Sequence, residues 1–315
     1  MNSIAINKHR AFRQVSASYP TQHKARLIRL QKRLMKKMEV YNMVERVSKK
    51  EINLFNPSFK RNEVEFNILC KIIEDDNTIA FQDQDINIIA LQSLGKSMWI
   101  WINEKQLAGS MNATIDELCS ELEHEDLQCV SGNPKLIELF AKKYSDIKKI
   151  EYNLGMGMIA YHCPVVIKPR SVVGRMVISN GTHIDTIAEF LAGIHEECYD
   201  EKVTKESQIE SASGLIESTN LYLWEANNKI VGMANIAHRS TCHGRINAVF
   251  TSAKKRNNGY ATGLIAEISL LLHREGLTPM LYTDDKNPVS NKIYMNLGYI
   301  QTGRIQDIRF TPKDI

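Results

Sequence analysis

Residues 248–264 combine residue types that could bind an anion. An apolar run ends in Val249-Phe250-Thr251, a short basic turn follows, and a helix opens with Arg256-Asn257-Asn258-Gly259-Tyr260-Ala261-Thr262. The first turn of a helix has unpaired backbone N–H groups and the positive end of the helix dipole, so it attracts negative charge. Gly259 lets the backbone approach a bulky group, and the small Ala261 keeps the rim open. The segment therefore predicts a seat for a pyrophosphate.

A second segment, residues 281–299, contains the pattern N-x-x-S-x-x-I-Y-x-x-x-G-Y from Asn287 to Tyr299. It begins as a strand, passes through a polar turn and continues as a helix. Together the two segments resemble motifs A and B of the GNAT acetyltransferases, R/Q-x-x-G-x-G/A and N-x-x-S/A-x-x-[LI]-Y-x-x-x-G-[FY], in the correct order and spacing. The second motif is similar to that of the branch called FR47-like, and the flanking elements extend the resemblance over residues 175–312.

The resemblance implies a GNAT acyl-CoA N-acyltransferase fold, an α/β domain with a mixed sheet, with acetyl-CoA as acyl donor and no metal. A backbone N–H within Val249–Thr251 then polarises the thioester carbonyl. The resemblance also implies that Tyr294 protonates the departing thiolate, a role that suits a phenol with a pKa near 10. The alternative for Tyr294 is a core aromatic on an amphipathic helix. The implied cofactor-binding residues are Val249, Phe250, Thr251, Arg256, Asn257, Asn258, Gly259, Tyr260, Ala261, Thr262, Asn287 and Asn291.

The general base stays unassigned. The strand expected over residues 245–250 contains no Glu or Asp, and Asn247 stands where a base would be sought. The remaining candidates are Glu225, His238 and His243, each of which is typical of a surface or hairpin residue. A chain of water molecules is an equal alternative.

The N-terminal half contains a partial echo of the same layout. A strand at 127–130, a turn at 131–134 and a helix at 135–144 repeat the arrangement of motif A without its R-x-x-G-x-A. This favours a tandem in which a degenerate GNAT-like first half walls the acceptor site and binds no CoA; the alternative is an unrelated α+β domain. The sequence predicts a basic helical extension at 1–60, the GNAT-like domain at 61–165 and a catalytic domain at 172–315.

Hydrophobic periodicity predicts further elements. Strands are expected at 78–82, 87–92 and 98–103, and helices at 63–74 and 112–122. Strands at 147–153 and 156–162 are expected to meet at a hairpin or bulge around Gly155, and the chain is expected to finish with two strands, 299–304 and 305–310.

The net charge of +4 is distributed unevenly along the chain. Residues 1–50 hold thirteen Lys and Arg against two acids, whereas the other 265 residues hold 27 against 34. An amphipathic helix is expected over 22–50. Its basic faces suit a solvated helix that packs on the protein or on a second copy; binding of nucleic acid or an anionic surface is the sharper alternative.

Composition narrows the class of protein. No apolar run approaches the roughly 18 residues of a membrane span, and the start does not have the pattern of a secretory signal. Six scattered cysteines without a C-x-x-C pair argue against zinc or a disulfide framework. The sequence thus predicts a cytoplasmic, monomeric or homodimeric N-acetyltransferase that acts on a primary amine of a small molecule or peptide through a ternary complex. The alternative is a non-catalytic acetyl-CoA sensor or a nucleic-acid-associated protein.

Overall fold

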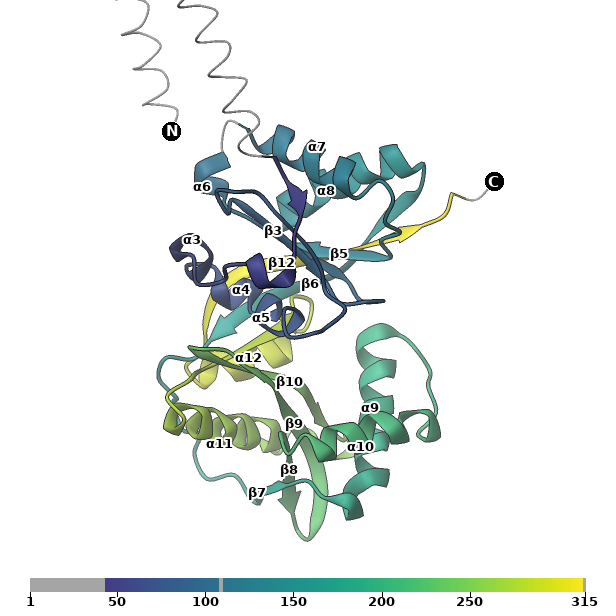
Figure 1. Cartoon of the computed structure of the whole chain (residues 1–315). Coiled ribbons are helices and arrows are strands. Elements are labelled where there is room, and N and C mark those ends of the chain that lie inside the picture. Colours follow the sequence, from purple (N-terminus) through teal and green to yellow (C-terminus); the bar gives the residue numbers. More distant parts are fainter. Residues whose placement is uncertain (1–42, 108–109, 314–315) are drawn as a thin grey trace, which may run out of the picture. The chain divides into compact units, whose positions relative to one another are not determined.

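The computed structural model describes residues 43–107 and 110–313, which form two compact units (Figure 1). The first unit holds the described residues of 43–62, 68–155 and 306–313, and the second holds 63–67 and 156–305. Two long strands, β6 (Glu151–His162) and β12 (Ile300–Thr311), contribute residues to both units. The three-domain division predicted from the sequence stays a prediction.

The first unit is built on a mixed sheet. Its strands are β1 (Glu45–Arg46), β2 (Ile79–Gln82), β3 (Ile88–Gln92), β4 (Met98–Ile102) and β5 (Cys129–Gly132). Strands β1 to β4 pair antiparallel in order, β4 and β5 pair parallel, and residues 306–309 of β12 pair antiparallel with β5. Its helices are η1 (Lys49–Glu51), α3 (Pro57–Lys60), α5 (Ile68–Ile72), α6 (Glu104–Leu107), α7 (Met111–Glu121) and α8 (Pro134–Lys148). The three strands and the helix expected between 78 and 122 are confirmed.

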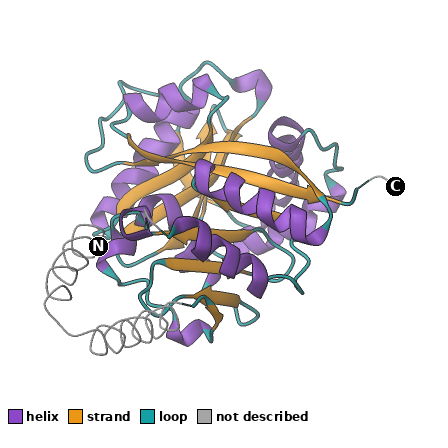
Figure 2. Cartoon of the chain, turned by 90° about the horizontal axis from the view of Figure 1, so that it is seen from above, coloured by secondary structure: helices purple, strands orange, loops and turns teal. Residues whose placement is uncertain are grey.

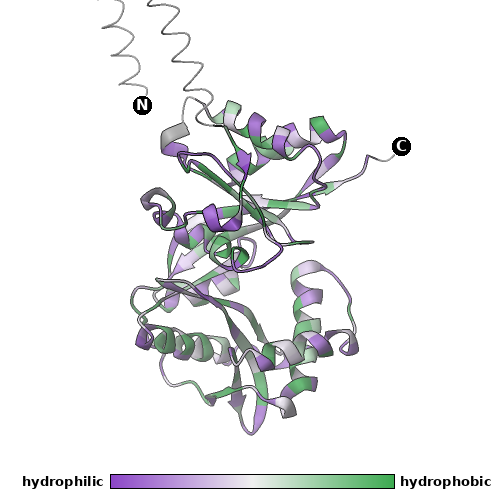
Figure 3. Cartoon of the chain, viewed as in Figure 1, coloured by the Kyte–Doolittle hydropathy of each residue, from purple (hydrophilic) through white to green (hydrophobic). Residues whose placement is uncertain are grey.

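Helix α8 shows how local sequence sets the boundaries of an element. The Asn133 side chain accepts hydrogen bonds from the backbone N–H groups of Lys135 (3.1 Å) and Leu136 (3.4 Å), and Pro134 occupies the first helical position. The apolar face of α8, which alternates with polar positions in Figure 3, buries Phe140 and Tyr144 in the core of the unit. The helix therefore starts within the segment predicted as a turn.

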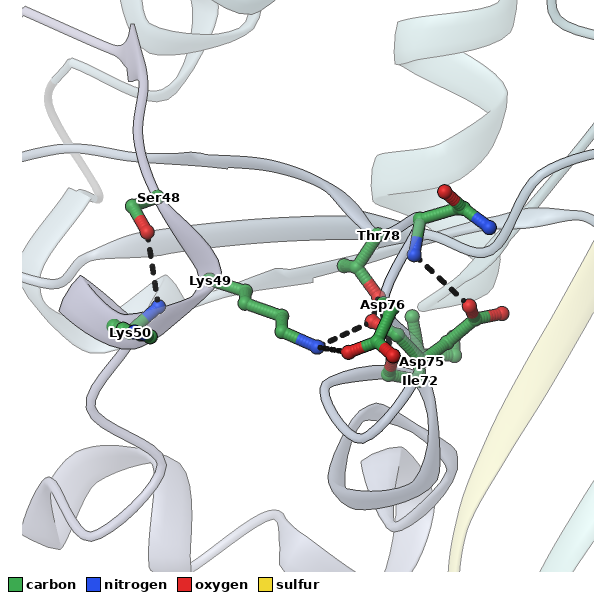
Figure 4. Close-up of polar contacts among 8 residues, drawn as sticks. Ser48, Lys49, Lys50, Ile72, Asp75, Asp76 and Thr78 are labelled. Atoms are coloured by element: carbon green, nitrogen blue, oxygen red, sulfur yellow. Dashed lines mark hydrogen bonds and ion pairs between the residues drawn. The ribbon is translucent and has the colours of Figure 1, made fainter.

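The described part of the N-terminal basic segment contains no α-helix. Residues 45–46 form β1, and η1 follows, so the helix expected over 22–50 is wrong for this part; the rest of it lies outside the described residues. Lys49 anchors the segment, because its Nζ donates to the Asp75 carbonyl oxygen (2.7 Å) and lies 3.0 Å from Oδ1 of Asp76 (Figure 4). Val44 is buried in the core of the first unit. Residues 43–51 thus belong to the folded unit.

The second unit contains one parallel pair of strands within an otherwise antiparallel sheet. The order is β6, β11 (Thr278–Asp284), β10 (His243–Thr251), β9 (Lys229–Arg239), β8 (Leu221–Ala226) and β7 (Arg175–Ile178). Only β10 and β11 pair parallel among these neighbours. The helices are α4 (Glu63–Phe66), η2 (Gly181–His183), α9 (Ile184–Tyr199), η3 (Glu206–Gln208), α10 (Ile209–Glu217), η4 (Ala253–Lys255), α11 (Tyr260–Arg274) and α12 (Pro288–Asn296).

The two faces of this sheet carry different helices. Alternate residues of β8 point to opposite sides: Trp224 packs in the cluster of α11 and α12, and Leu223 packs in the cluster of α9 and α10. Figure 2 shows helices (purple) lying along the strands (orange). Helix α11, green over most of its length in Figure 3, buries eight of its fifteen residues.

The strand order of the two units is the same. In each, three antiparallel strands (β2–β4 or β8–β10) lead through a helix (α7 or α11) to a parallel strand (β5 or β11), which leads into a further helix (α8 or α12). This repeat agrees with the predicted tandem. It also corrects one detail: β5 and α8 hold the positions of β11 and α12, which carry motif B, and do not echo motif A.

The neighbour of each parallel strand comes from the other half of the sequence. Strand β12 follows α12 but pairs with β5, and β6 follows α8 but pairs with β11. Both strands run unbroken, so the predicted hairpin or bulge near Gly155 and the predicted break at 304–305 are wrong. Their glycines mark close approach instead: a Cβ at Gly157 would lie 2.9 Å from Oδ2 of Asp285.

Candidate active site

A cavity of about 780 Å³ opens where the parallel strands of the second unit separate. The pairing of β10 with β11 ends at Ile246 and Leu281, although β10 continues to Thr251 and β11 to Asp284. The carboxyl ends of the two strands therefore have no common hydrogen bonds, and ligands of α/β sheets bind at such ends. The wall comprises residues of α9, the end of β10, the start of α11 and α12, namely Ile194, Glu197, Cys198, Val249, Phe250, Thr251, Lys255, Arg256, Asn257, Gly259, Tyr260, Ala261, Thr262, Ile265, Asn287, Pro288, Val289, Ser290, Lys292, Ile293, Tyr294 and Asn296.

A bulge in β10 accompanies the separation. Asn247 pairs with Asn235 and Phe250 with Met233, so two residues of β10, Ala248 and Val249, face a single residue of β9. Ala248 has φ +49°, an uncommon conformation for a residue with a side chain. Since β11 no longer pairs at this level, Val249 has no register partner on β9 or β11.

The N-terminus of α11 faces the same cavity. Gly259 caps it with φ +77°, a left-handed conformation that glycine adopts without cost, and no side chain caps the helix. A Cβ there would meet only Val172 methyl carbons at 3.6 and 3.8 Å, so backbone conformation, not crowding, explains the glycine. Tyr260, Ala261 and Thr262 line the cavity with first-turn N–H groups that have no intrahelical acceptor.

Asn258 is the one residue of the predicted 256–262 stretch that does not line the cavity. Its Nδ2 donates to the carbonyl oxygens of Lys255 (3.1 Å) and Arg256 (2.9 Å). It thus closes the turn between η4 and α11. Asn258 therefore stabilises the turn that leads into the predicted pyrophosphate seat.

Arg256 is held in an ion pair that the sequence did not predict. One Nη lies 2.6 and 2.7 Å from the two carboxylate oxygens of Glu197 on α9, and Nε donates to the Thr251 carbonyl oxygen at 3.0 Å. The guanidinium carbon also lies 5.6 Å from the centre of the Phe250 ring. Glu197 comes from a helix 59 residues away in sequence, and no local pattern signals the contact.

Tyr294 lies on the cavity wall and is buried in an aromatic cluster. Its ring centre is 6.3 Å from that of Tyr161 and 5.8 Å from that of Tyr299. Burial, followed by the nearby Cys198 thiol, raises the pKa of Tyr294 well above its ordinary value. The phenol therefore keeps its proton throughout the physiological range.

Asn287 and Asn291 differ in position. Asn287 lines the cavity, and its side-chain oxygen caps α12 by accepting from the Ser290 N–H at 3.0 Å. Asn291 is buried away from the wall, and its Nδ2 donates to the carbonyl oxygens of Asp284 (3.0 Å) and Asn287 (2.7 Å). It fixes the turn between β11 and α12.

None of the side chains considered as general base lines the cavity. Glu225 pairs with Arg175 at 2.8 Å on β7, and His238 is buried opposite Arg245. His243 begins β10, the end remote from the cavity, and its Nδ1 lies 3.0 Å from the buried Glu63 carboxylate. Asn247 is exposed next to the bulge.

Neither a metal-binding cluster nor a membrane-spanning helix occurs in the described residues, 43–107 and 110–313. They contain no cluster of three or more His, Cys, Asp or Glu side chains able to hold a metal ion. Within the same ranges, every helix is too short or too polar to cross a membrane.

Comparison with known proteins reveals relatives in sequence and fold. Residues 185–299 match the sequence model of the acetyltransferase (GNAT) family. No curated protein matches the chain. Three solved structures with 10–13% identity are similar in fold: a Drosophila protein (TM-score 0.58, 10% identity), an acetyltransferase from the GNAT family from Colwellia psychrerythraea (0.50, 11%) and a GCN5-related N-acetyltransferase from Sphaerobacter thermophilus (0.50, 13%). The alignments cover 87%, 86% and 79% of this chain and 100%, 99% and 86% of the others.

Proposed function

We propose that residues 185–299, which match the acetyltransferase (GNAT) family, form a domain that transfers an acetyl group from acetyl-CoA to a primary amine of a small molecule or peptide. The transfer is direct, within a ternary complex. The observation that carries the proposal is that three features border one cavity. They are the N-terminus of α11, which no side chain caps, the bulge of β10 and the protonated phenol of Tyr294.

Different parts of the cavity wall bind different parts of acetyl-CoA. The pyrophosphate binds to the first-turn N–H groups of α11, beside Arg256, Lys255 and Lys292. The pantetheine arm runs past the apolar side chains of Ile194, Val249 and Ile293 toward Tyr294. Asn258 and Asn291 shape the two turns of the wall without touching the cofactor.

The bulge supplies the electrostatic part of the reaction. A neutral amine attacks the thioester carbonyl carbon, the C–N bond forms and negative charge develops on the oxygen. A backbone N–H of Val249, which has no paired neighbour on β9 or β11, donates to that oxygen. The C–S bond then breaks, and the amine proton passes to water.

Tyr294 donates its proton to the thiolate that leaves. Its raised pKa makes it a weak acid in water, but a thiolate released into the same apolar surroundings is equally deprived of solvent and gains proton affinity. Burial thus raises the pKa of the Tyr294 phenol and that of the CoA thiol together, because both anions lose hydration.

A thiol-release assay tests this function. Acetyl-CoA is offered with amino acids, polyamines, aminoglycosides and peptides, and the acetylated product is identified by mass spectrometry. We expect thiol release that depends on one class of amine. Calorimetric binding of acetyl-CoA without turnover on any amine would contradict the proposal and favour a sensor.

A further inference from the structure

Strand β10 presents two different faces before its bulge. Ile246 packs in the core beneath α11, and a Cβ at Gly244 would collide with Leu272 of that helix. Because side chains alternate along a strand, Arg245 and Asn247 point to the opposite face. Helix α9 covers that face only further along, where Ala248 and Phe250 pack with its cluster.

Neighbouring strands extend this polar region. Asn235 of β9 donates from Nδ2 to Oδ1 of Asn247 at 2.9 Å, and the Arg245 guanidinium carbon lies 5.8 Å from the ring centre of Tyr282 on β11. Asn247 is exposed, and Arg245 and Tyr282 are half-buried. We call these four residues the polar strip. It lies where the pairing of β10 and β11 ends.

Arg245 is a cation without a counter-charge in the described chain. Four other arginines of this unit, Arg175, Arg239, Arg256 and Arg304, each pair with a carboxylate. The Arg245 side chain makes no hydrogen bond or ion pair with a described residue, and its buried Nε has no partner. Burial lowers the pKa of this guanidinium, although arginine stays charged in proteins.

An unpaired, partly desolvated guanidinium is unfavourable unless an anion forms an ion pair with it. Its two Nη groups form a fork that fits two oxygens of a carboxylate or phosphate. The Arg245 Cα is two residues from Asn247, about 7 Å at roughly 3.3 Å per residue, and the bulge begins at the next residue. An anion at Arg245 is thus several bonds away from an amine at the bulge.

We propose that Arg245 binds an anionic oxygen group of the acyl acceptor, so that the enzyme selects amines that also carry a carboxylate or phosphate. This inference rests on the proposed function. The acceptor lies along the polar strip, with its anion at Arg245, its middle beside Asn247 and its amine at the separation of β10 and β11.

Matched pairs of acceptors test the proposal. One arm compares a dipeptide that has a free carboxylate with its amide, and the other compares an amino sugar phosphate with the unphosphorylated amino sugar. We expect kcat/KM to be at least about tenfold higher for the anionic member of one pair. Arg245→Gln should abolish that preference while leaving the neutral member unchanged, and Arg245→Lys should restore part of it.

Two controls distinguish binding of an anion by Arg245 from a role of Arg245 in packing. Arg245 does not line the cavity, so acetyl-CoA Kd should be unchanged in Arg245→Gln. Equal use of anionic and neutral acceptors by the wild type, or an equal loss for both in Arg245→Gln, would overturn the inference and leave the proposed function intact. Failure of every amine would instead overturn the proposed function, and the inference with it.

Discussion

The two units use the same strand order, but only the second separates its parallel strands. Pairing of β10 with β11 stops five residues before the end of β10. In the first unit, pairing of β4 with β5 continues to Gly132, the last residue of β5. A Cβ at Gly132 would lie 2.8 Å from the Ile100 carbonyl oxygen, so the two strands are in close contact there. The layout is thus common to both units, whereas the separation of the parallel strands, beside which the cavity lies, belongs to the second.

The connections that follow these strands have equal length and different chemistry. Eight residues, 103–110, join β4 to α7, and eight, 252–259, join β10 to α11. Counted from the strand ends, Leu107 stands at the position of Arg256 and Ser110 at that of Gly259. Ser110 has φ −126°, whereas Gly259 has φ +77°. At these two positions the first unit therefore has an apolar residue in place of the arginine and no left-handed residue in place of the glycine.

The helices that follow β5 and β11 differ at their seventh position by one oxygen atom. Both α8 and α12 begin with proline after an Asn cap, and the seventh helical residue is Phe140 in the first and Tyr294 in the second. Phe140 is buried in the core of its unit. Loss of the phenol agrees with the expectation, still a prediction, that the first unit is degenerate.

The largest effect is expected from Tyr294→Phe, which gives α12 the side chain of α8. The change removes a group that acts as the thiolate leaves, so kcat should fall by about 100-fold, the low end for a general acid because a thiol is a good leaving group. Acetyl-CoA Kd should stay nearly constant. Steady-state kinetics, calorimetry and a melting curve measure the three quantities.

Tyr144→Phe is the matched control in the first unit. The Tyr144 hydroxyl donates to the Glu125 carbonyl oxygen and accepts from the Leu127 N–H at 3.2 Å, so its loss should lower Tm without changing kcat. A wild-type kcat in stably folded Tyr294→Phe would make Tyr294 a packing residue like Phe140.

The next largest effect is expected from Gly259→Asp. An aspartate at the cap occupies the first-turn N–H groups and repels phosphate, so acetyl-CoA should bind at least tenfold more weakly, about 1.4 kcal/mol. Gly259→Asn tolerates the positive φ without the charge and should lose less. Ser110→Asp, at the corresponding cap of the first unit, should leave Kd unchanged in calorimetry. Undiminished affinity in Gly259→Asp would reject the seat.

A smaller effect, of opposite sign, is expected from Glu197→Gln. The carboxylate competes with phosphate for Arg256 and repels it, so its neutralisation should tighten acetyl-CoA binding by a few fold, within the range of about 0–1 kcal/mol for exposed pairs. The gain should shrink at high salt. Weaker binding by Glu197→Gln would mean that Glu197 positions Arg256 for the cofactor.

No effect on the cofactor is expected from deleting residues 1–42. The cavity is lined by residues 194–296, all in the second unit, so acetyl-CoA Kd should match that of the full chain. The deletion stops at 42 because Val44 is part of the first core. A truncated, folded protein with impaired affinity would assign the basic segment a role at the cofactor.

The sequence predicted the elements around the cavity well because the signals there are local. An apolar strand before a basic turn and a glycine at a helix start indicate α11, and the strand, polar turn and helix predicted within 281–299 are β11 and α12. The sequence does not predict the bulge, because neither Ala248 nor Val249 is a residue type typical of turns. Their conformation depends on how β10 pairs with β9. Glu197 was missed because α9 reaches Arg256 only in the folded unit.

The breaks predicted within β6 and β12 are wrong for a related reason. Gly155, Gly157 and Gly303 resemble turn signals in sequence, but each stands where a side chain elsewhere in the chain needs the space of a missing Cβ. For Gly303 that side chain is Glu65. Local sequence cannot distinguish a glycine that bends the chain from one that admits a distant neighbour.

The exchanged last strands impose an order on synthesis. The ribosome completes β1 to β5 and α8 before residues 306–309 exist, so the β5 edge has no β12 partner until the second unit has been synthesised. Unpaired strand edges attract other chains, and pairing over such a sequence separation is slow. The first unit cannot finish folding ahead of the second. A cut within 163–170 would separate β6 from the second half and leave β11 without its neighbour, so neither fragment would be expected to stay monomeric on its own.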